Sequence, residues 1–158
     1  MSLKFAEDET FKGLDYTQTP LEKGDYENCV FERCNFSHSD LSAVNFTDCE
    51  FEHGDLSMAN ISNTAFRNVS FANCKLLGLR FEACNLREVD FVEADLSGAV
   101  FENCDLQGAI FENTNLEKAD FRTAENVSLN PDINKISKAK FSVDGAIGLL
   151  AKYDIIVG

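Results

Sequence analysis

Six cysteines and two histidines are the residues of this 158-residue chain best suited to redox or metal chemistry. Metal-binding cysteines usually come in close pairs such as Cys-x-x-Cys, and the chain has none. The cysteines are instead separated by multiples of five residues, at positions 29, 34, 49, 74, 84 and 104. Because free cysteine packs as a small apolar residue, we expect six free thiols in the core. A metal or redox protein is the weaker alternative.

The remaining candidates for catalysis are also weak. His38 and His53 occupy equivalent positions of a five-residue repeat, where a solvated surface role is expected. The chain has no Gly-x-Ser-x-Gly nucleophile motif and no glycine-rich phosphate loop. Acidic side chains are numerous, but close carboxylates without a cleft are poor evidence of acid–base chemistry. The sequence therefore predicts a protein that is not an enzyme and has no cofactor or metal site.

The element that must position all these residues is a strict five-residue repeat. Every fifth position from Phe11 to Phe121 is large and apolar: twelve Phe, eight Leu, two Tyr and Ile61. Helices repeat near 3.6 residues and strands at 2, so this period fits neither element alone. A short strict repeat is typical of a solenoid, in which each unit packs only against its neighbours.

The other slots of the repeat are equally regular. Two places before the large residue, 19 of 20 residues from Gly24 to Ala119 are small, and Leu79 is the exception. The slot directly before the large residue is often Asp or Asn, and the two slots after it carry Glu, Ser, Arg, Asn and Gly. We expect one large and one small side chain to point inward, and the other slots to face water or support turns.

This pattern, A(N/D)LXX, resembles the pentapeptide-repeat family, with clear copies at Ala94–Gly98 and Ala119–Thr123. The resemblance implies an all-β solenoid, a right-handed quadrilateral β-helix with 20 residues per coil. The predicted organisation is an N-terminal cap over 1–10, a β-helix of about 5–6 coils over 11–123, and a capping and dimerisation segment over 124–158. Phe5 is predicted to plug the N-terminal end, and Gly145–Tyr153 to form a short C-terminal α-helix.

Charge lies mainly on the repeat region. The chain carries 27 acids against 14 bases, a net of −13, and residues 11–123 hold 20 acids and 9 bases. The 20-residue column that contains Phe11, Phe31 and Phe51 belongs to the most acidic predicted side. Its acids are Glu32, Glu50, Glu52, Asp90, Glu93 and Glu112. One explanation is a coat that keeps the protein soluble; the other is a surface that imitates nucleic acid. The sign of the charge disfavours direct binding to DNA or RNA.

The C-terminal segment adds a second resemblance. Asn130–Ile136 and Ile155–Gly158 are similar to the tail of a subgroup with Qnr-type and microcin-immunity-type proteins. This resemblance implies a homodimer joined through the tail, with Ala146, Leu149, Leu150, Ile155 and Val157 at the interface. It also implies an acidic rod that binds a bacterial type II topoisomerase, DNA gyrase or topoisomerase IV, as a DNA mimic and protects it from quinolones or toxins. Some Qnr-type proteins have loops that interrupt the rod, whereas this register is unbroken.

The alternative function is a general interaction or structural scaffold with no topoisomerase partner. No apolar stretch approaches the roughly 20 residues that span a bilayer, and the N-terminus lacks the regions of a signal peptide. We therefore expect a cytoplasmic protein that does not bind membranes.

Overall fold

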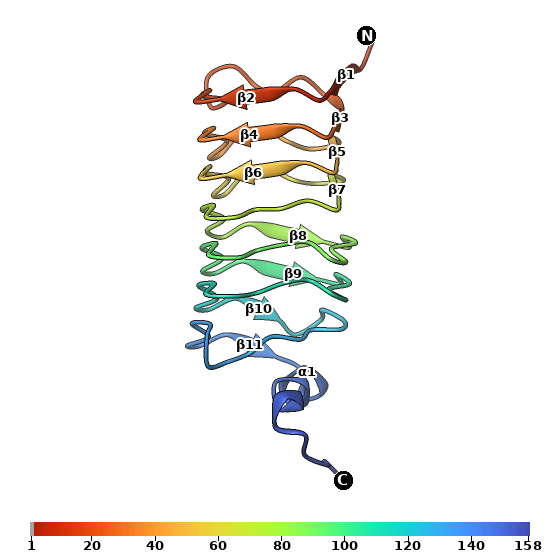
Figure 1. Ribbon diagram of the computed structural model, residues 1–158, viewed down its shortest axis with the longest axis vertical. Helices are drawn as coiled ribbons and strands as arrows, with labels where there is room; N and C mark the ends of the chain where they lie inside the picture. Colours follow the sequence, from red (N-terminus) through yellow and green to blue (C-terminus); the bar gives the residue numbers. More distant parts are fainter. Residues whose placement is uncertain (1) are drawn as a thin grey trace.

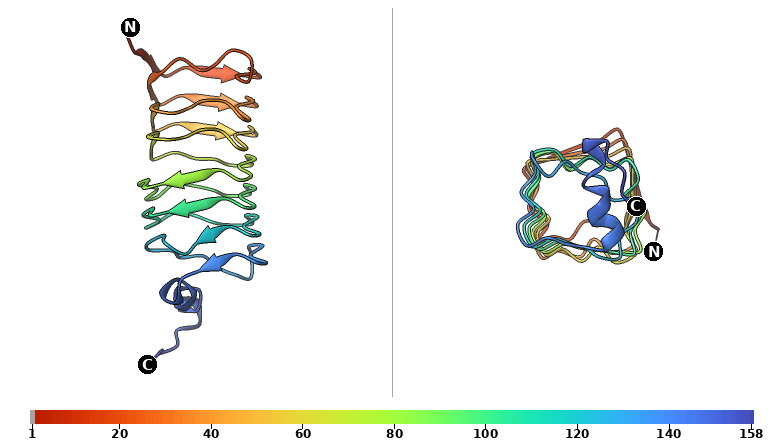
Figure 2. Two further views of the ribbon diagram at one scale, coloured as in Figure 1. Left: turned by 180° about the vertical axis from the view of Figure 1, so that it is seen from behind. Right: turned by 90° about the horizontal axis from the view of Figure 1, so that it is seen from below.

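The chain forms a parallel β-solenoid. The computed structural model describes residues 2–158. Successive coils stack along one axis, with the two termini at opposite ends (Figure 1). Viewed along the axis, the coils superpose as a four-sided frame (Figure 2). The predicted quadrilateral solenoid with 20 residues per coil is thus confirmed.

The strands are short and come from three of the four sides. They are β1 (Lys4–Glu7), β2 (Thr10–Lys12), β3 (Gly24–Glu27), β4 (Val30–Glu32), β5 (Asn45–Thr47), β6 (Glu50–Glu52), β7 (Ala65–Arg67), β8 (Arg80–Glu82), β9 (Val100–Glu102), β10 (Asp120–Phe121) and β11 (Lys140–Phe141). They form three parallel sheets, in the orders β1-β3-β5-β7, β2-β4-β6 and β11-β10-β9-β8. Every paired residue lies opposite one 20 positions away, as in Phe31↔Phe51 and Phe81↔Phe101.

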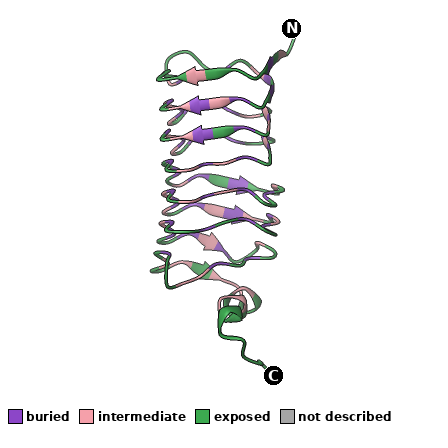
Figure 3. Cartoon of the chain, in the orientation of Figure 1, coloured by how far each residue is buried: buried purple, intermediate pink, exposed green. Residues whose placement is uncertain are grey.

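The large apolar residues fill the inside of the frame. The aromatic rings of the column that starts at Phe11 are stacked, with centroid separations between 4.8 and 5.6 Å from Phe11 to Phe111. Neighbouring columns meet edge to face, for example Phe46 with Phe51 at 5.1 Å and 77°. Offset and edge-to-face pairs contribute about 0.5–1.5 kcal/mol each beyond burial. Buried residues alternate with exposed ones along the coils in the middle of the rod, and β2 and β11 at its ends have none (Figure 3).

The Asp/Asn slot explains why many sides of the frame are turns rather than strands. Asp95 Oδ1 accepts a hydrogen bond from the backbone N–H of Ser97 at 3.0 Å, and Asn115 Oδ1 accepts one from Glu117 at 3.1 Å. Such bonds mimic a backbone turn. Where the slot holds Val30, Glu50 or Val100, the segment is a strand instead, although strands also form at Asp25, Asn45 and Asp120. The predicted turn-supporting role of this slot is confirmed.

The last slot of the repeat turns the corner. Its backbone has positive φ in 18 non-glycine residues, including Ala43 at 57° and Glu93 at 56°. His38 and His53 occupy the same slot, with φ of 56° and 53°. Their backbone conformation, rather than any imidazole chemistry, is what the repeat requires at these positions.

The coils extend beyond both ends of the apolar register. β1 pairs with β3 from Lys4 to Glu7, and β11 pairs with β10 at Lys140–Phe141. Residues 4–141 therefore make about seven turns, more than the 5–6 predicted. The backbone ladder continues where the large apolar residue is missing, because its hydrogen bonds do not depend on side-chain type.

The N-terminal plug prediction was wrong. Phe5 is 59% exposed on the outside of β1, and its neighbour Ala6 is buried instead. The alternation of strand side chains points only one of the two inward. β1 can approach β3 this closely because Gly24 has no side chain: a Cβ there would lie 1.9 Å from the carbonyl oxygen of Lys4.

The C-terminus forms α1 (Val143–Gly148) and a 3₁₀ turn, η1 (Ala151–Tyr153). Ser142 caps α1, and its hydroxyl accepts a hydrogen bond from the N–H of Gly145 at 3.0 Å. The predicted short C-terminal helix is confirmed, but its bounds differ: it begins two residues earlier than Gly145 and ends at Gly148 rather than Tyr153. Among residues 2–158, no helix has the length and apolar character needed to cross a membrane.

Candidate interaction surfaces

The predicted acidic face lies on the side that contains β2, β4 and β6. The parallel register stacks Glu32 beside Glu52, and Val30 beside Glu50. Farther along the rod, the same side continues through turns that carry Asp90, Glu93 and Glu112. The stacking of coils thus places the six predicted acids on one side of the rod.

These six acids differ in what their carboxylates contact. Glu32 forms ion pairs with Lys12 at 3.0 Å and Arg33 at 3.5 Å, and the hydrogen bond from Lys12 lowers the pKa of Glu32. Asp90 Oδ1 accepts the backbone N–H of Val92 at 2.8 Å, so this carboxylate holds a turn.

The other four acids are uncompensated. Within residues 2–158, Glu50, Glu52, Glu93 and Glu112 have no ion-pair partner. Glu50, Glu93 and Glu112 are exposed and Glu52 is half-buried. The sequence could not separate these four from Glu32 and Asp90, because the separation depends on contacts between coils. Of the six predicted acids, these four are the most available to a partner.

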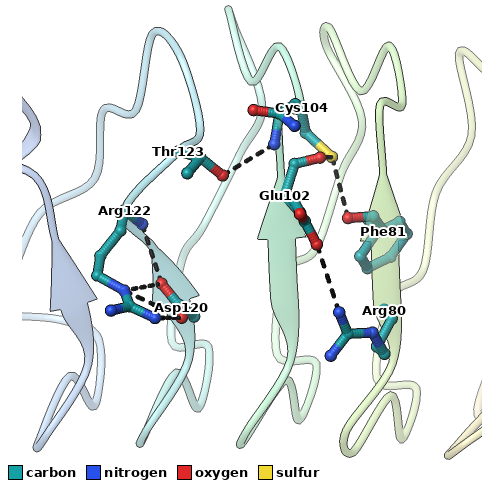
Figure 4. Close-up of polar contacts among 8 residues, drawn as sticks. Arg80, Phe81, Glu102, Cys104, Asp120, Arg122 and Thr123 are labelled. Carbon is teal, nitrogen blue, oxygen red and sulfur yellow. Dashed lines mark hydrogen bonds and ion pairs between the residues drawn. The ribbon is translucent and has the colours of Figure 1, made fainter.

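On the side that contains β8–β11, by contrast, carboxylates are held in ion pairs. Arg80 bonds Glu102 at 3.3 Å, and Arg122 bonds Asp120 at 2.8 Å (Figure 4). The hydrogen bonds from Arg122 lower the pKa of Asp120. Ion pairs thus offset much of the charge on this side.

The C-terminal end is an exposed apolar surface. Of the predicted interface residues, Ala146 is exposed, Leu150 is 39% exposed, Ile155 54% and Val157 52%. Leu149 packs partly against the core. Sequence reasoning missed Ile156, which is 98% exposed, as well as Val143 and Tyr153, which are exposed on the same segment.

The cysteines occupy the inward slot, as predicted. All six are free thiols, and five of them are buried. Within residues 2–158, no cluster of His, Cys, Asp or Glu is arranged to hold a metal ion.

Comparison with known families identifies the repeat. One family model, for the pentapeptide repeat region, matches residues 64–141, and another, for eight copies of the pentapeptide repeat, matches residues 29–68. The chain belongs to the pentapeptide-repeat family. No curated protein sequence is significantly similar to this pentapeptide-repeat protein.

Three solved structures have low sequence identity to it and TM-scores below 0.5. One is QnrB1, a plasmid-mediated fluoroquinolone resistance protein, in a trypsin-treated form: 20% identity over 97% of this chain and 99% of that chain, TM-score 0.38. A pentapeptide repeat protein from the thylakoid lumen of Arabidopsis thaliana has 20% identity over 78% and 70%, TM-score 0.38. HetL from the cyanobacterium Nostoc, involved in the regulation of heterocyst differentiation, has 15% identity over 89% and 85%, TM-score 0.37.

Proposed function

We propose that this pentapeptide-repeat protein acts by binding, not by catalysis, and that its acidic side takes the place of a DNA duplex on a bacterial type II topoisomerase. The observation that carries the proposal is the row of uncompensated carboxylates Glu50, Glu52, Glu93 and Glu112 on one side of a rigid rod. A basic DNA-binding groove attracts such a row and repels a basic surface.

The size of the rod supports the proposal. About seven coils at about 4.8 Å each give a length near 34 Å, over which a DNA duplex carries about 20 charges. Residues 4–141 carry 25 acids and 13 bases, a net of −12. The charge of the rod is therefore of the same order as that of the duplex it would replace.

The proposed setting is the bacterial cytoplasm, where DNA gyrase and topoisomerase IV act on DNA. QnrB1 is described as a fluoroquinolone resistance protein. The proposed outcome for the present protein is likewise protection of the topoisomerase from quinolones or toxins, or inhibition of supercoiling. Neither nucleic acid nor membrane is a proposed direct partner.

A gyrase supercoiling assay tests the proposal. The purified protein is titrated with and without a fluoroquinolone, and parallel assays use topoisomerase IV. We expect restored supercoiling in the presence of the drug, or inhibition in its absence. No effect on either enzyme at a large molar excess would refute the proposal and favour a general interaction scaffold, whose partner a pull-down would seek.

Matched variants locate the surface. Changing Glu50, Glu52, Glu93 and Glu112 together to Lys should raise the concentration needed for the effect by at least about tenfold. The control changes four acids on other sides, Glu22, Glu27, Glu117 and Glu125, to Lys. Because the net charge is the same in both variants, an equal loss in both would mean that overall charge matters and the acidic side does not.

We also propose that the protein is a homodimer joined through the C-terminal segment. The exposed apolar side chains of Leu150, Ile155, Ile156 and Val157 support this, since clustered exposed apolar residues mark interaction surfaces. Two copies joined tail to tail would form a rod of about twice the length.

A further inference from the structure

Among the interior coils that the structure describes, the wall of the solenoid has one break, which we call the seam; bonds between coils are also missing at the two ends of the rod, between 21–23 and 40–42 and between 111–113 and 130–132. In a regular coil, the N–H of Leu41 donates to the carbonyl of Asn60 at 2.8 Å, and that of Ala43 to Ser62 at 3.0 Å. One coil later, the equivalent N–H groups of Ile61 and Asn63 have no carbonyl partner in the next coil, within the part of the chain that the structure describes. On the adjacent side, the same bonds are missing between 65–68 and 85–88.

The seam arises because two neighbouring sides change conformation in opposite directions between the same two coils. Asn60 holds a turn through a bond from the N–H of Ser62 at 3.1 Å, but Arg80, which should lie beside it, begins strand β8. Ala65 begins strand β7, but Asn85 holds a turn through a bond from Arg87 at 3.2 Å. A strand and a turn present their N–H and C=O groups at different spacings, so the ladder is lost on both sides.

Two surface depressions lie along the seam. One, of about 410 Å³, is lined by residues of both coils, among them Asn60, Asn63, Arg80 and Glu82. The second, of about 400 Å³, lies on the adjacent side between 66–68 and 85–88. On the other two sides the ladder continues, as in the bonds from Phe51 to Ser70 and from Leu56 to Lys75.

Cys84 lies at the corner between the two broken sides. The other five thiols each bond the carbonyl 23 residues earlier, in the preceding coil; Cys104, for example, bonds Phe81 at 3.4 Å (Figure 4). Among the described residues, Cys84 bonds no carbonyl of the preceding coil; it bonds the carbonyl of Glu82, within its own coil, at 3.5 Å. It is also the one cysteine of the six that is half-exposed rather than buried.

The pKa of Cys84 is shifted in the opposite direction to the pKa of two buried thiols. Burial raises the pKa of Cys49 to about 11 and that of Cys74 to about 12. A hydrogen bond with the Cys104 thiol lowers the pKa of Cys84. The thiolate, not the thiol, is the nucleophile. A larger fraction of Cys84 than of Cys49 or Cys74 is therefore thiolate at neutral pH.

We propose that Cys84 is a modification site, reached through the seam, that reacts with low-molecular-weight disulfides. Its thiolate attacks one sulfur of the disulfide, whose S–S bond breaks, and a mixed disulfide forms on Cys84. The leaving thiolate takes up the proton that Cys84 lost. One disulfide and one protein thiol thus yield one mixed disulfide and one small thiol. The proposal does not depend on the topoisomerase hypothesis.

The test counts thiols in the native protein with an aromatic disulfide that releases a coloured thiolate. We expect one thiol to react rapidly and five only after denaturation, and mass spectrometry should find the fast label on Cys84. Cys84→Ala should abolish the fast reaction, and Cys49→Ala should preserve it. Alanine is a fair replacement because five repeats have it in this slot. A fast label on another cysteine, no fast thiol, or six equal rates would overturn the proposal.

Amide hydrogen exchange tests the seam without any substitution. The N–H groups of Ile61 and Asn63 should exchange at least about tenfold faster than those of Leu41 and Ala43, their counterparts in the preceding coil. Equal protection of the two pairs would show that the wall is closed and would remove the route to Cys84.

Discussion

At the scale of single residues, the corner slot of the repeat requires a positive φ, which costs conformational free energy for every residue other than glycine. A left-handed conformation costs a non-glycine residue roughly 1–2 kcal/mol. Eighteen such residues occupy the corner slot, and only Gly13, Gly78, Gly98 and Gly108 meet the requirement without strain. The corner slot is therefore a place where stability can be gained.

Ala43→Gly tests this cost. Ala43 is exposed and has φ of 57°, so glycine should relieve strain and stabilise the fold by up to about 1 kcal/mol after its larger unfolded-state entropy is subtracted. The control is Ala72→Gly, one slot away with ordinary backbone, which should destabilise by about 0.5–1 kcal/mol. Chemical denaturation measures both, and a change of the same sign in the two variants would contradict the strain argument.

Asp40 makes stability depend on pH. Hydrogen bonds from the hydroxyl and N–H of Ser42, together with Lys23, lower its pKa from 3.8 to about 2. Because the folded-state pKa lies below the unfolded one, the contribution is complete above about pH 4 and is lost as the pH falls toward 2.

Asp40→Asn isolates this contribution, since asparagine keeps the oxygen that accepts the turn bond but has no charge to lose. The difference in Tm between the parent and Asp40→Asn should be constant from pH 7 to 5 and should shrink below pH 4. Glu117→Gln, at an acid without such contacts, is the control for the general loss of negative charge. A difference that does not change with pH would contradict the assignment.

At the scale of elements, the stacked rings make each coil depend on its two neighbours. Phe71 is fully buried, with ring centroids 5.2 Å from Phe51 and 5.6 Å from Phe91. Phe71→Ala should leave a cavity in the middle of the column and destabilise the protein by about 3–5 kcal/mol. Phe5→Ala, at the exposed ring on β1, should change stability by less than about 0.5 kcal/mol. Thermal melts measure both variants. A melting temperature of Phe71→Ala within a degree of that of the parent would contradict this account.

The five-residue register predicts the solenoid, its columns and the small inward slot, because these depend only on spacing. It does not predict which sides are strands: Asp25, Asn45 and Asp120 occupy the Asp/Asn slot and lie in strands β3, β5 and β10, whereas Asp95 and Asn115 hold turns. Two signals for the seam are nevertheless in the sequence. Leu79 replaces the usual small residue directly before β8. In the Asp/Asn slot, Asn60 is followed one coil later by Arg80 on one side, and Ala65 is followed by Asn85 on the neighbouring side.

The ends were harder to predict. After Phe121 the pattern of apolar residues is lost, yet Phe141 stacks on Phe121 at 5.2 Å and Lys135 pairs with Asn115. Backbone pairing with an existing coil can continue without side-chain periodicity, so a search for the pattern alone stops too early. The division of the acidic side into paired and unpaired carboxylates likewise depends on contacts between coils.

At the scale of the whole molecule, the C-terminal tail should set the oligomeric state. We expect light scattering to give twice the chain mass of 17.6 kDa for the parent protein. Ile155→Asp combined with Val157→Asp should give a monomer with an unchanged melting profile, because neither residue packs in the core. Leu3→Asp, an equally exposed change at the opposite end, should leave the dimer intact. A monomeric parent at high protein concentration would rule out the dimer.

The vertical columns have a consequence for how such a rod can change. Gain or loss of 20 residues would keep every column in phase and alter the length by about 4.8 Å. Gain or loss of only five residues would also keep large residues inward, but would rotate every later coil by a quarter turn about the axis. If the change fell between Glu52 and Glu93, then Glu93 and Glu112 would leave the side that holds Glu50 and Glu52. A single short insertion could thus re-aim half of the surface while the interior still packed.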